Sequence, residues 1–460
     1  MPTTIKTVST LVLLAAVTGG VSSQSVTWSQ ISTKTAPPAR AFHAMAYDAA
    51  RDRVVVFGGR TGSTHMDDTW EFDGTNWSEM KPTKSPAKRF DARMVYDPIR
   101  KRIILFGGQD KDAYGDTWEW DGSNWTPRTS ATSPSRRRAS SMFFDPKLGK
   151  IVLFGGRSAI GGFNYNDTWT WDGSKWAELS PKSPPAARMG APVDYDVKRG
   201  RAVMFGGWSG SERGDTWEWD GSKWTEFTTT VRPDDRNDAS IVGLPGVAVL
   251  FGGFGSNRKP RGDTWTFDEK GWMQIKLPKS PAARYSHRAV YDSKRERILL
   301  FAGSNNFPSG LFNDTWSLPV RLATFKTFGK GCASSTALPT ISSTTVPRLG
   351  QSLELHLKGF LPKAQIGQLI LGASDKTWGT IPLPLPLSVI NMGNCVLFVS
   401  IDIVHPIATD PQGNAQTIFK VPLDTSFLGA VLFGQAVGPD AKANTLGLAT
   451  TNAFKAVVGL

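Results

Sequence analysis

Cysteine and histidine are the residues that this sequence has least of. Two cysteines and five histidines occur among 460 residues, so the chain offers few metal ligands and little thiol chemistry. Long hydrophobic runs are also scarce, because the one apolar stretch, Leu11–Val17, is too short to span a bilayer. These shortages predict a protein without a metal, a cofactor or a membrane span.

The same apolar stretch has the form of a secretory signal. Lys6 precedes it, and small residues follow as far as Ser23, which predicts a signal peptide over residues 1–23 and a secreted, periplasmic or extracellular location. Cys332 and Cys395 would then lie in an oxidising compartment, where we expect them to form a disulfide.

Glycine and proline are abundant and exclude long helices. The 46 glycines and 30 prolines make up about one residue in six, which favours short strands separated by turns. The sequence therefore predicts an all-β protein.

Three motifs recur in phase six times, at intervals of 46 to 51 residues. Phe-Gly-Gly begins at Phe57, Phe106, Phe154, Phe205 and Phe251, and the sixth copy is Phe301-Ala-Gly. Asp-Thr-Trp begins at Asp68, Asp116, Asp167, Asp215, Asp263 and Asp314. Pro-x-x-Arg ends at Arg40, Arg89, Arg137, Arg188, Arg236 and Arg284. Each unit reads as four antiparallel strands with Gly-Gly ending the second, so six units predict a six-bladed β-propeller over residues 24–322.

The two ends of the repeat predict how the ring closes. The sixth unit stops after Asp314-Thr-Trp without a fourth strand, and the segment around Trp28 is a fourth strand without a unit. We expect this N-terminal strand to complete the sixth blade and to remove an exposed edge.

These repeats resemble kelch-repeat proteins, in the superfamily that includes galactose oxidase. The resemblance rests on Phe-Gly-Gly, the tryptophan of Asp-Thr-Trp about a dozen residues later, a second tryptophan and the period, over about residues 25–320. It implies a propeller whose loops at one end form a binding surface. It does not imply one activity, because members include oxidases, sugar epimerases and protein-interaction modules.

Residues 323–460 lack the repeat and predict a β-sandwich with one disulfide. Short apolar segments alternate with proline and glycine turns. The pattern of Gly331-Cys332, Gly393-Asn-Cys395 and Leu428-Gly-Ala-Val-Leu-Phe-Gly-Gln435 resembles a C-terminal domain that recurs in secreted proteins of environmental bacteria such as planctomycetes.

The six repeated arginines, Arg40, Arg89, Arg137, Arg188, Arg236 and Arg284, are candidate ligand-binding residues with two interpretations. They begin the first strands and could ring the channel mouth as an anion-recognising surface for carboxylates or sulfates. Alternatively they pair with the equally periodic aspartates, which is the interpretation we favour.

Aromatic residues outside the repeat are the second candidates. Fifteen of the seventeen tryptophans fall at repeat positions and are expected in the core, whereas Trp208 follows Gly207 in a predicted loop. Tyr114, Tyr165 and Phe254 occupy matching loops, together with Phe163 and Phe307, and could form an aromatic rim. Such a rim would bind a carbohydrate or protein ligand, and the alternative is ordinary packing within the loops.

The turns between first and second strands carry thirteen cations, which account for much of the net charge of +13. They are Arg51, Arg53, Arg100, Lys101, Arg102, Lys147, Lys150, Lys198, Arg199, Arg201, Lys294, Arg295 and Arg297. An acidic polysaccharide is one partner for such a face, and solvated hairpin charge is the simpler interpretation. Nucleic acid is not expected.

No catalytic residue can be assigned from the sequence. His43 and His287 share a repeat position but lack a third metal ligand, and the cysteine that copper-radical chemistry needs in galactose oxidase is absent from the repeats. The sequence thus predicts an exported, non-catalytic binding or scaffold protein. The alternative is a carbohydrate-active enzyme of the epimerase or lyase type, with an unpaired acid or tyrosine of shifted pKa at the channel mouth.

Overall fold

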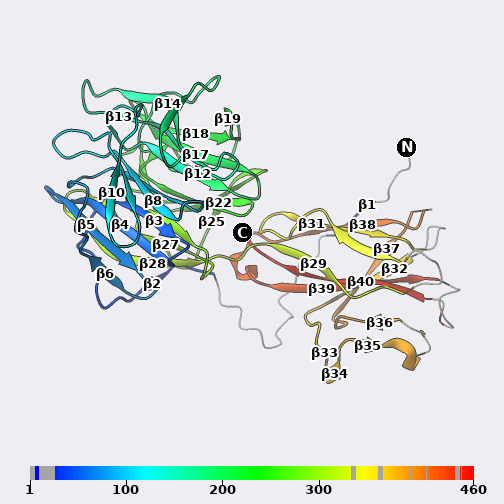
Figure 1. Ribbon diagram of the computed structural model, residues 1–460. Helices are drawn as coiled ribbons and strands as arrows, with labels where there is room; N and C mark the ends of the chain where they lie inside the picture. Colours follow the sequence, from blue (N-terminus) through cyan, green and yellow to red (C-terminus); the bar gives the residue numbers. More distant parts are fainter. Residues whose placement is uncertain are drawn as a thin grey trace. The chain divides into compact units, whose positions relative to one another are not determined.

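The computed structural model describes residues 6–9, 26–332, 338–360, 366–390, 392, 395–410, 412–440, 446 and 448–460. The chain is nearly all β, as predicted, and forms two units (Figure 1). One unit is Thr27–Pro319, and the other is Val320–Leu460 together with the N-terminal segment as far as Val26. In the described part of the chain, no helix has the length and apolar character needed to cross a membrane.

The first unit is a six-bladed propeller. Each blade is an antiparallel sheet, and in every blade but the sixth its strands follow one another in sequence. Blade one consists of β3 (Ala44–Asp48), β4 (Arg53–Thr61), β5 (Thr64–Phe72) and β6 (Trp77–Met80). Blade two consists of β7 (Arg93–Asp97), β8 (Arg102–Phe106), β9 (Thr117–Trp120) and β10 (Trp125–Arg128). Blade three consists of β12 (Ser141–Asp145), β13 (Lys150–Ser158), β14 (Asn164–Trp171) and β15 (Trp176–Leu179), with the short β11 (Arg137–Arg138) paired to β13.

Blades four to six repeat this arrangement. They are β16 (Val193–Asp196), β17 (Arg201–Trp208), β18 (Glu212–Trp219) and β19 (Trp224–Phe227); β21 (Ser240–Leu244), β22 (Val247–Phe251), β24 (Thr264–Asp268) and β25 (Gly271–Ile275), beside the pair β20 (Arg236–Asn237) and β23 (Phe254–Gly255); and β26 (Arg288–Asp292), β27 (Arg297–Asn306), β28 (Gly310–Pro319) and β2 (Ser29–Ile31).

The N-terminal strand closes the ring as predicted. β2 pairs antiparallel with β28, with Ser29 opposite Ser317 and Ile31 opposite Thr315. Trp28, just before β2, is fully buried and packs on Phe251 of blade five. The sixth blade is therefore assembled from both ends of the propeller sequence.

The Gly-Gly pairs have a different role from the predicted one. In blades one, three and four the second strand continues beyond the pair through a β-bulge, and in blade six it does so through Ala302-Gly303. Gly58 and Gly59 both have positive φ, and a Cβ on Gly59 would lie 2.8 Å from the carbonyl oxygen of Ala41. Glycine is required here because the bulge brings two backbones into contact. The second strand ends at phenylalanine only in blades two and five.

Tryptophans of the fourth strands link neighbouring blades. The indole nitrogen of Trp77 donates to Thr315 Oγ1 of blade six at 2.9 Å, and that of Trp125 donates to Thr69 Oγ1 of blade one at 2.9 Å. Trp176, Trp224 and Trp272 make the equivalent bond. The prediction that all repeat tryptophans are core residues was wrong for four of the six Asp-Thr-Trp residues, because Trp70, Trp118, Trp169 and Trp217 are only half-buried. Trp265 and Trp316 of the same set are buried, as predicted.

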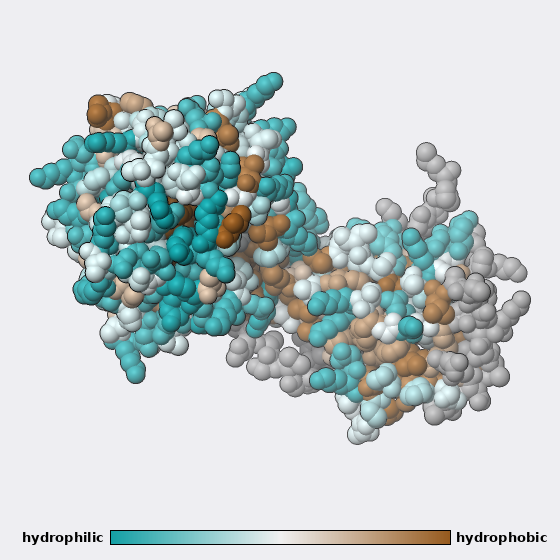
Figure 2. Space-filling view, viewed as in Figure 1, coloured by the Kyte–Doolittle hydropathy of each residue, from teal (hydrophilic) through white to brown (hydrophobic). Residues whose placement is uncertain are grey.

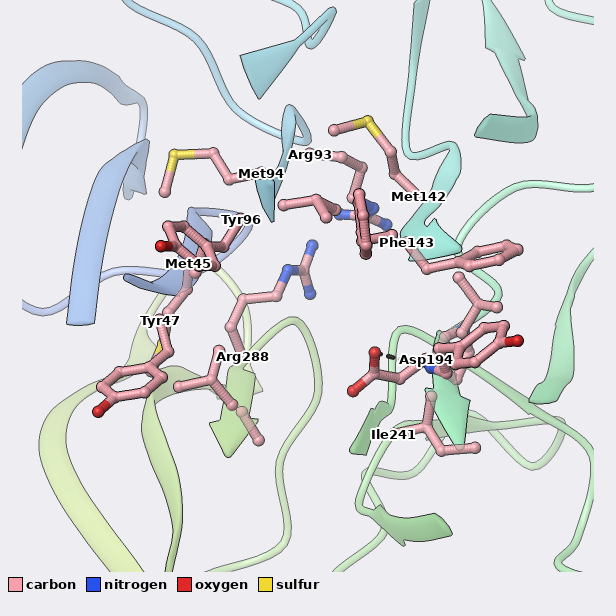
Figure 3. A pocket seen from close by; sticks show the side chains of 18 of the residues that line it. Met45, Tyr47, Arg93, Met94, Tyr96, Met142, Phe143, Asp194, Ile241 and Arg288 are labelled. Atoms are coloured by element: carbon pink, nitrogen blue, oxygen red, sulfur yellow. Dashed lines mark hydrogen bonds between the residues drawn. The ribbon is translucent and has the colours of Figure 1, made fainter. Parts of the chain in front are cut away.

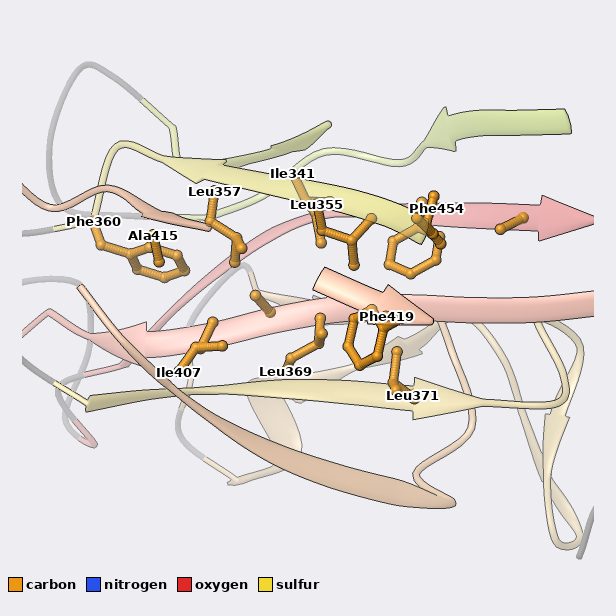
Figure 4. Packing of buried hydrophobic residues seen from close by; sticks show 13 residues of the cluster. Ile341, Leu355, Leu357, Phe360, Leu369, Leu371, Ile407, Ala415, Phe419 and Phe454 are labelled. Carbon is orange, nitrogen blue, oxygen red and sulfur yellow. The ribbon is translucent and has the colours of Figure 1, made fainter. Parts of the chain in front are cut away.

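The second unit is a β-sandwich of two sheets. One has the order β1 (Lys6–Ser9), β38 (Ala415–Lys420), β31 (Ser352–Lys358), β30 (Thr340–Ser343), and the other has β29 (Thr324–Phe328), β40 (Leu448–Val457), β39 (Val431–Pro439), β32 (Ile366–Gly372), β37 (Ile403–Ala408). Figure 4 shows side chains of both sheets meeting between them, including Leu355, Leu369 and Phe454. Short strands β33 (Thr377–Trp378), β34 (Ile381–Pro382), β35 (Leu385–Pro386) and β36 (Val396–Leu397) and the 3-10 turns η1 (Leu387–Ile390) and η2 (Thr425–Phe427) complete it.

Cys332 and Cys395 form the predicted disulfide, with their Cα atoms 5.1 Å apart, and both lie in this unit. Its first strand, β1, falls within the predicted signal peptide and pairs in parallel with β38. The hydrophobic region of that peptide, Leu11–Val17, lies outside the described residues, so cleavage stays a prediction.

Candidate functional site

The six repeated arginines are buried and paired within their own blades. Arg188, for example, donates from both terminal nitrogens to the two oxygens of Asp215 at 2.7 Å, and from Nη1 to the carbonyl of Gly206 at 2.8 Å. Arg40, Arg89, Arg137, Arg236 and Arg284 repeat this bidentate contact with the aspartate of their own Asp-Thr-Trp motif. This is the pairing that we favoured, and the buried guanidinium groups do not form an exposed anion-recognising ring.

The paired aspartates also anchor the neighbouring tryptophan. Asp215 Oδ2 accepts a hydrogen bond from the indole nitrogen of Trp217 at 2.7 Å, and the other five motifs do the same. Burial opposes ionisation of Asp215, but the bonds and charge of Arg188 together with the bond from Trp217 hold the pKa of that carboxyl below its ordinary value. The motif residues therefore stabilise each blade.

Two of the predicted rim residues cover these arginines. The ring of Tyr114 lies over the guanidinium of Arg89, with the Arg89 Cζ atom 4.0 Å from the ring centroid. Tyr165 covers Arg137 in the same way at 3.9 Å. Both rings therefore have one face occupied, which the sequence did not reveal.

A closed ring of backbone hydrogen bonds joins all six blades around the channel. The residues that form it each donate from N–H to the carbonyl of the preceding blade, at 2.8 to 3.0 Å, and all have positive φ. They are Phe42, Asp91, Ala139, Gly190, Asp238 and Ser286. We call this set the backbone ring. It lies just before the first strands, at the end of the propeller that also carries the loops between second and third strands, which we call the loop face.

A cavity of about 430 Å³ fills the channel between the backbone ring and the opposite end. At the ring it reaches Gly190, and at the other end it is lined by turn residues that include Pro98, Pro146 and Val197. These belong to the hairpins between first and second strands, so we call that end the hairpin face. The cavity therefore opens on the hairpin face and ends at the ring.

Three charged side chains line this cavity between apolar walls. Figure 3 shows the guanidinium groups of Arg93 and Arg288 and the carboxylate of Asp194 among methionine and aromatic side chains. Burial and the nearby charge of Arg93 lower the pKa of Arg288 to about 9. Burial raises the pKa of Asp194 to about 6, although its carboxylate accepts hydrogen bonds from the backbone N–H groups of Tyr195 and Gly243 at 2.8 Å.

Two aspartates of the backbone ring adjoin the arginines. Asp91 Oδ1 lies 4.0 Å from Arg288 Nη2, and Asp91 Oδ2 accepts a bond from Arg138 Nη1 at 2.9 Å. Burial and the charge of Asp91 raise the pKa of Asp238, and Arg288, Arg93 and Arg138 oppose this increase.

The loop face carries aromatic side chains stacked with arginines. Arg60 lies over the ring of Phe307, with 4.5 Å from Cζ to the centroid, and Arg157 lies over Trp208 at 5.0 Å. Trp208 ends β17 instead of lying in a loop, because its backbone pairs with Met189 in both directions. Phe254 forms the short β23 and packs on Tyr285 at 4.9 Å.

Two exposed apolar residues of this face lie in the loop between β13 and β14. Ile160 is 84% exposed and Phe163 is 53% exposed. The loop leads into Asn164, whose side-chain amide donates to the carbonyl of Trp208 at 3.0 Å. Ile160, Phe163, Arg157 and Trp208 thus form one patch across blades three and four, which we call the loop-face patch.

Ion pairs neutralise part of the hairpin face. Arg51, for example, bonds Asp48 at 2.8 Å and Glu71 at 2.7 Å. Seven of the thirteen predicted cations have such a partner, namely Arg51, Arg100, Arg199, Arg201, Lys294, Arg295 and Arg297. The other six have no ion pair within the described residues.

His43 and His287 are core residues. Both are fully buried, and burial lowers the pKa of each well below its ordinary value. They pack edge-on against Phe301 and Phe251. Among the residues that the structure describes, no group of three histidine, cysteine or acidic side chains could hold a metal ion.

The sequence contained a signal for the cavity residues that we did not use. Asp194 takes the third place of its first strand, where the other blades have Ala46, Val95, Phe143, Val242 and Val290. Arg93 and Arg288 take the first place, where the other blades have Ala44, Ser141, Pro192 and Ser240. The charged residues of the cavity are therefore those that depart from the repeat, whereas most of the predicted site residues are repeated ones.

A six-bladed propeller with a closed ring and variable loops defines a fold class that hosts several functions, protein-binding scaffolds among them. The family model of the KLHDC2/KLHL20/DRC7 kelch-repeats domain matches residues 21–121 and 74–253, which together are just over half of the sequence. The chain belongs to the kelch-repeat family, whose propeller supports a binding or scaffold role.

A solved structure titled "Structure of YjhT" is similar, with 15% sequence identity, a TM-score of 0.49, and coverage of 61% of this chain and 95% of that chain. No curated protein matches the sequence significantly.

Proposed function

We propose that this chain is an exported, non-catalytic binding or scaffold protein that binds a protein partner through the loop-face patch. The exposure of Ile160 and Phe163 beside the stacked pair of Arg157 and Trp208 carries the proposal. Exposed apolar groups around an aromatic and an arginine have the composition of energetic hot spots in protein interfaces.

Stacking on this face favours a protein over a carbohydrate. A sugar binds an aromatic residue by lying against the face of its ring. On the loop face, Arg157 occupies one face of Trp208 and Arg60 occupies one face of Phe307. These rings therefore offer less open area to a sugar, whereas the arginines offer charged donors to a protein.

Matched isoleucine variants test the proposal. Ile160→Asp places a charge in the loop-face patch, and Ile99→Asp places one in a turn of the hairpin face, where Ile99 is 61% exposed. Wild type and both variants serve as baits in cross-linking mass spectrometry on the source organism's extracellular fraction, with a glycan array in parallel. We expect Ile160→Asp to lose a cross-linked protein that Ile99→Asp keeps. Retention of every partner by Ile160→Asp, or binding to glycans alone, would reject the proposal.

Export rests on the predicted signal peptide and on the disulfide, which is typical of oxidising compartments. The resemblance of residues 323–460 to a domain of secreted bacterial proteins supports it. N-terminal sequencing of the mature protein tests export, because cleavage near Ser23 is expected, and an intact Lys6–Ser9 segment in a cytoplasmic fraction would contradict it.

One observation favours the alternative, a carbohydrate-active enzyme of the epimerase or lyase type. Asp194 lines the cavity, and its raised pKa of about 6 suits a group that exchanges protons near neutral pH. Turnover of a panel of mono- and oligosaccharides that Asp194→Asn abolishes would establish this function instead.

A further inference from the structure

The floor of the cavity holds two guanidinium groups whose hydrogen-bonding nitrogens the protein satisfies only in part. Arg93 donates from Nε to the carbonyl of Ser140 at 2.6 Å, and Arg288 donates from Nη1 to the carbonyl of His287 at 2.8 Å. Arg93 Nη1 and Arg288 Nη2 are buried and have no hydrogen-bond acceptor in the described part of the chain. Buried charged donors without an acceptor are costly, so this geometry calls for an anionic group between them.

We propose that the channel cavity binds a small organic carboxylate, with its carboxylate held by Arg93 and Arg288 and its body between the apolar walls. The ligand lies on the opposite side of the backbone ring from the loop-face patch, so this site is independent of the proposed protein-binding role. Its volume of about 430 Å³ is in the range of small-molecule sites.

The surrounding acids select a single negative charge. Asp91 and Asp238 face the arginines from the backbone ring, and Asp194 faces the cavity from β16. Arg138 adds one further positive charge on the far side of Asp91. A doubly charged phosphate or sulfate would meet repulsion from these carboxylates, whereas the planar fork of an arginine matches a carboxylate with one charge.

The approach to the cavity is positively charged. The turns that supply the mouth residues Pro98, Pro146 and Val197 also carry Lys101, Lys147 and Lys198. These lysines are exposed and have no ion pair within the described residues. Unneutralised cations at a mouth raise the local concentration of an anionic ligand and speed its entry.

Asp194 and the walls define the body of the ligand. Met45, Met94, Met142 and Phe143 provide adaptable apolar contacts (Figure 3). The carboxylate oxygens of Asp194 each accept one backbone N–H and retain further lone pairs. The site therefore fits a carboxylate whose aromatic or aliphatic body carries a hydroxyl or amino group.

Isothermal titration of the full mature chain tests the proposal with three probes. Benzoate carries the charge, benzamide has the same shape without it, and 4-hydroxybenzoate adds a donor for Asp194. We expect one benzoate per chain, benzamide binding at least about tenfold more weakly, and 4-hydroxybenzoate binding more tightly than benzoate. Equal binding of benzoate and benzamide, or no binding of either acid at millimolar concentrations, would overturn the proposal.

Variants locate the binding. Arg288→Gln and Arg93→Gln, on different blades, should each weaken benzoate binding at least about tenfold, whereas Arg136→Gln, which alters an exposed arginine of the loop before β11, should leave it unchanged. If one cavity variant fails to fold, the other variant still tests the site. The difference between benzoate and benzamide binding to the wild-type protein also tests it. Unchanged benzoate affinity in a folded Arg288→Gln or Arg93→Gln protein would reject the site.

Discussion

The propeller and the sandwich are both built from antiparallel strands, but they satisfy their buried polar groups in different ways. The propeller uses the same arginine–aspartate–tryptophan contact six times. The sandwich uses single solutions, such as Gln435, which is fully buried and bonds the carbonyls of Val396 and Thr451. In the propeller a functional residue can therefore be recognised as a departure from the repeat, whereas the sandwich offers no such internal reference.

Deletion of the closing strand should have the largest effect on stability, and it should affect the propeller without affecting the sandwich. Deletion of residues 24–32 removes β2 and Trp28, leaves β28 as an apolar edge and opens the ring. We expect the propeller to lose cooperative thermal unfolding or to aggregate, while deletion of residues 1–23 leaves its transition in place. Identical calorimetric transitions for both deletions would show that β2 is dispensable.

Reduction of the disulfide should affect the sandwich without affecting the propeller. Cys332 and Cys395 lie 63 residues apart within the sandwich, so reduction should destabilise that unit by up to about 4 kcal/mol. The propeller transition should stay at its original temperature in calorimetry with a reductant. A Cys332→Ser/Cys395→Ser double variant, which cannot respond to the reductant, is the control. Movement of the propeller transition on reduction would contradict the division.

The sequence predicted the elements that repetition makes visible. Six blades, the closing strand and the pairing of Arg188 with Asp215 follow from motifs that occur in phase. The cavity could not be predicted in the same way, because Arg93 and Arg288 come close only when the ring closes and places blades two and six on either side of blade one. The bulges at Gly-Gly were also missed, since a glycine pair in sequence indicates either a strand end or a bulge.

The pH dependence of stability tests whether Asp194, which stands where the other blades have an apolar residue, has a raised pKa in the folded protein. Burial raises its pKa from 3.8 in the unfolded chain to about 6, so the folded protein holds this proton more tightly. The free energy of unfolding should therefore fall as the pH rises from about 4 to about 6, by on the order of 2 kcal/mol from this group.

Asp194→Asn removes this titration. Relative to wild type, the variant should become more stable between about pH 4 and pH 7 by on the order of 2 kcal/mol, whatever its stability at low pH. Urea denaturation of both proteins at each pH measures the difference. A constant difference across this range would show that Asp194 titrates normally.

Trp208 should give the smallest effect on stability. It is half-buried at the end of β17, whereas Trp219 is fully buried and donates to Asp145 at 2.9 Å. We expect Trp208→Ala to cost less than about 1 kcal/mol and Trp219→Ala to cost about 3–5 kcal/mol in chemical denaturation. Equal losses would place Trp208 with the structural residues and remove it from the loop-face patch.

One measurement compares Arg188, an arginine that recurs in every blade, with Arg288, which departs from the repeat. Arg188→Gln leaves the half-buried Asp215 without its bidentate partner and removes the buried bond to Gly206, and should lower the free energy of unfolding by about 3–5 kcal/mol. Arg288→Gln removes a charge that burial and Arg93 already oppose. Its contact with Asp91 is long at 4.0 Å, and Asp91 keeps its 2.9 Å bond from Arg138, so the free energy of unfolding should change by less than about 1 kcal/mol. Urea denaturation of the two variants beside wild type at neutral pH gives both values. A larger loss of stability for Arg288→Gln than for Arg188→Gln would contradict the central claim. That claim is that the repeated charged residues stabilise the propeller, whereas the charged residues that depart from the repeat bind a ligand in its cavity.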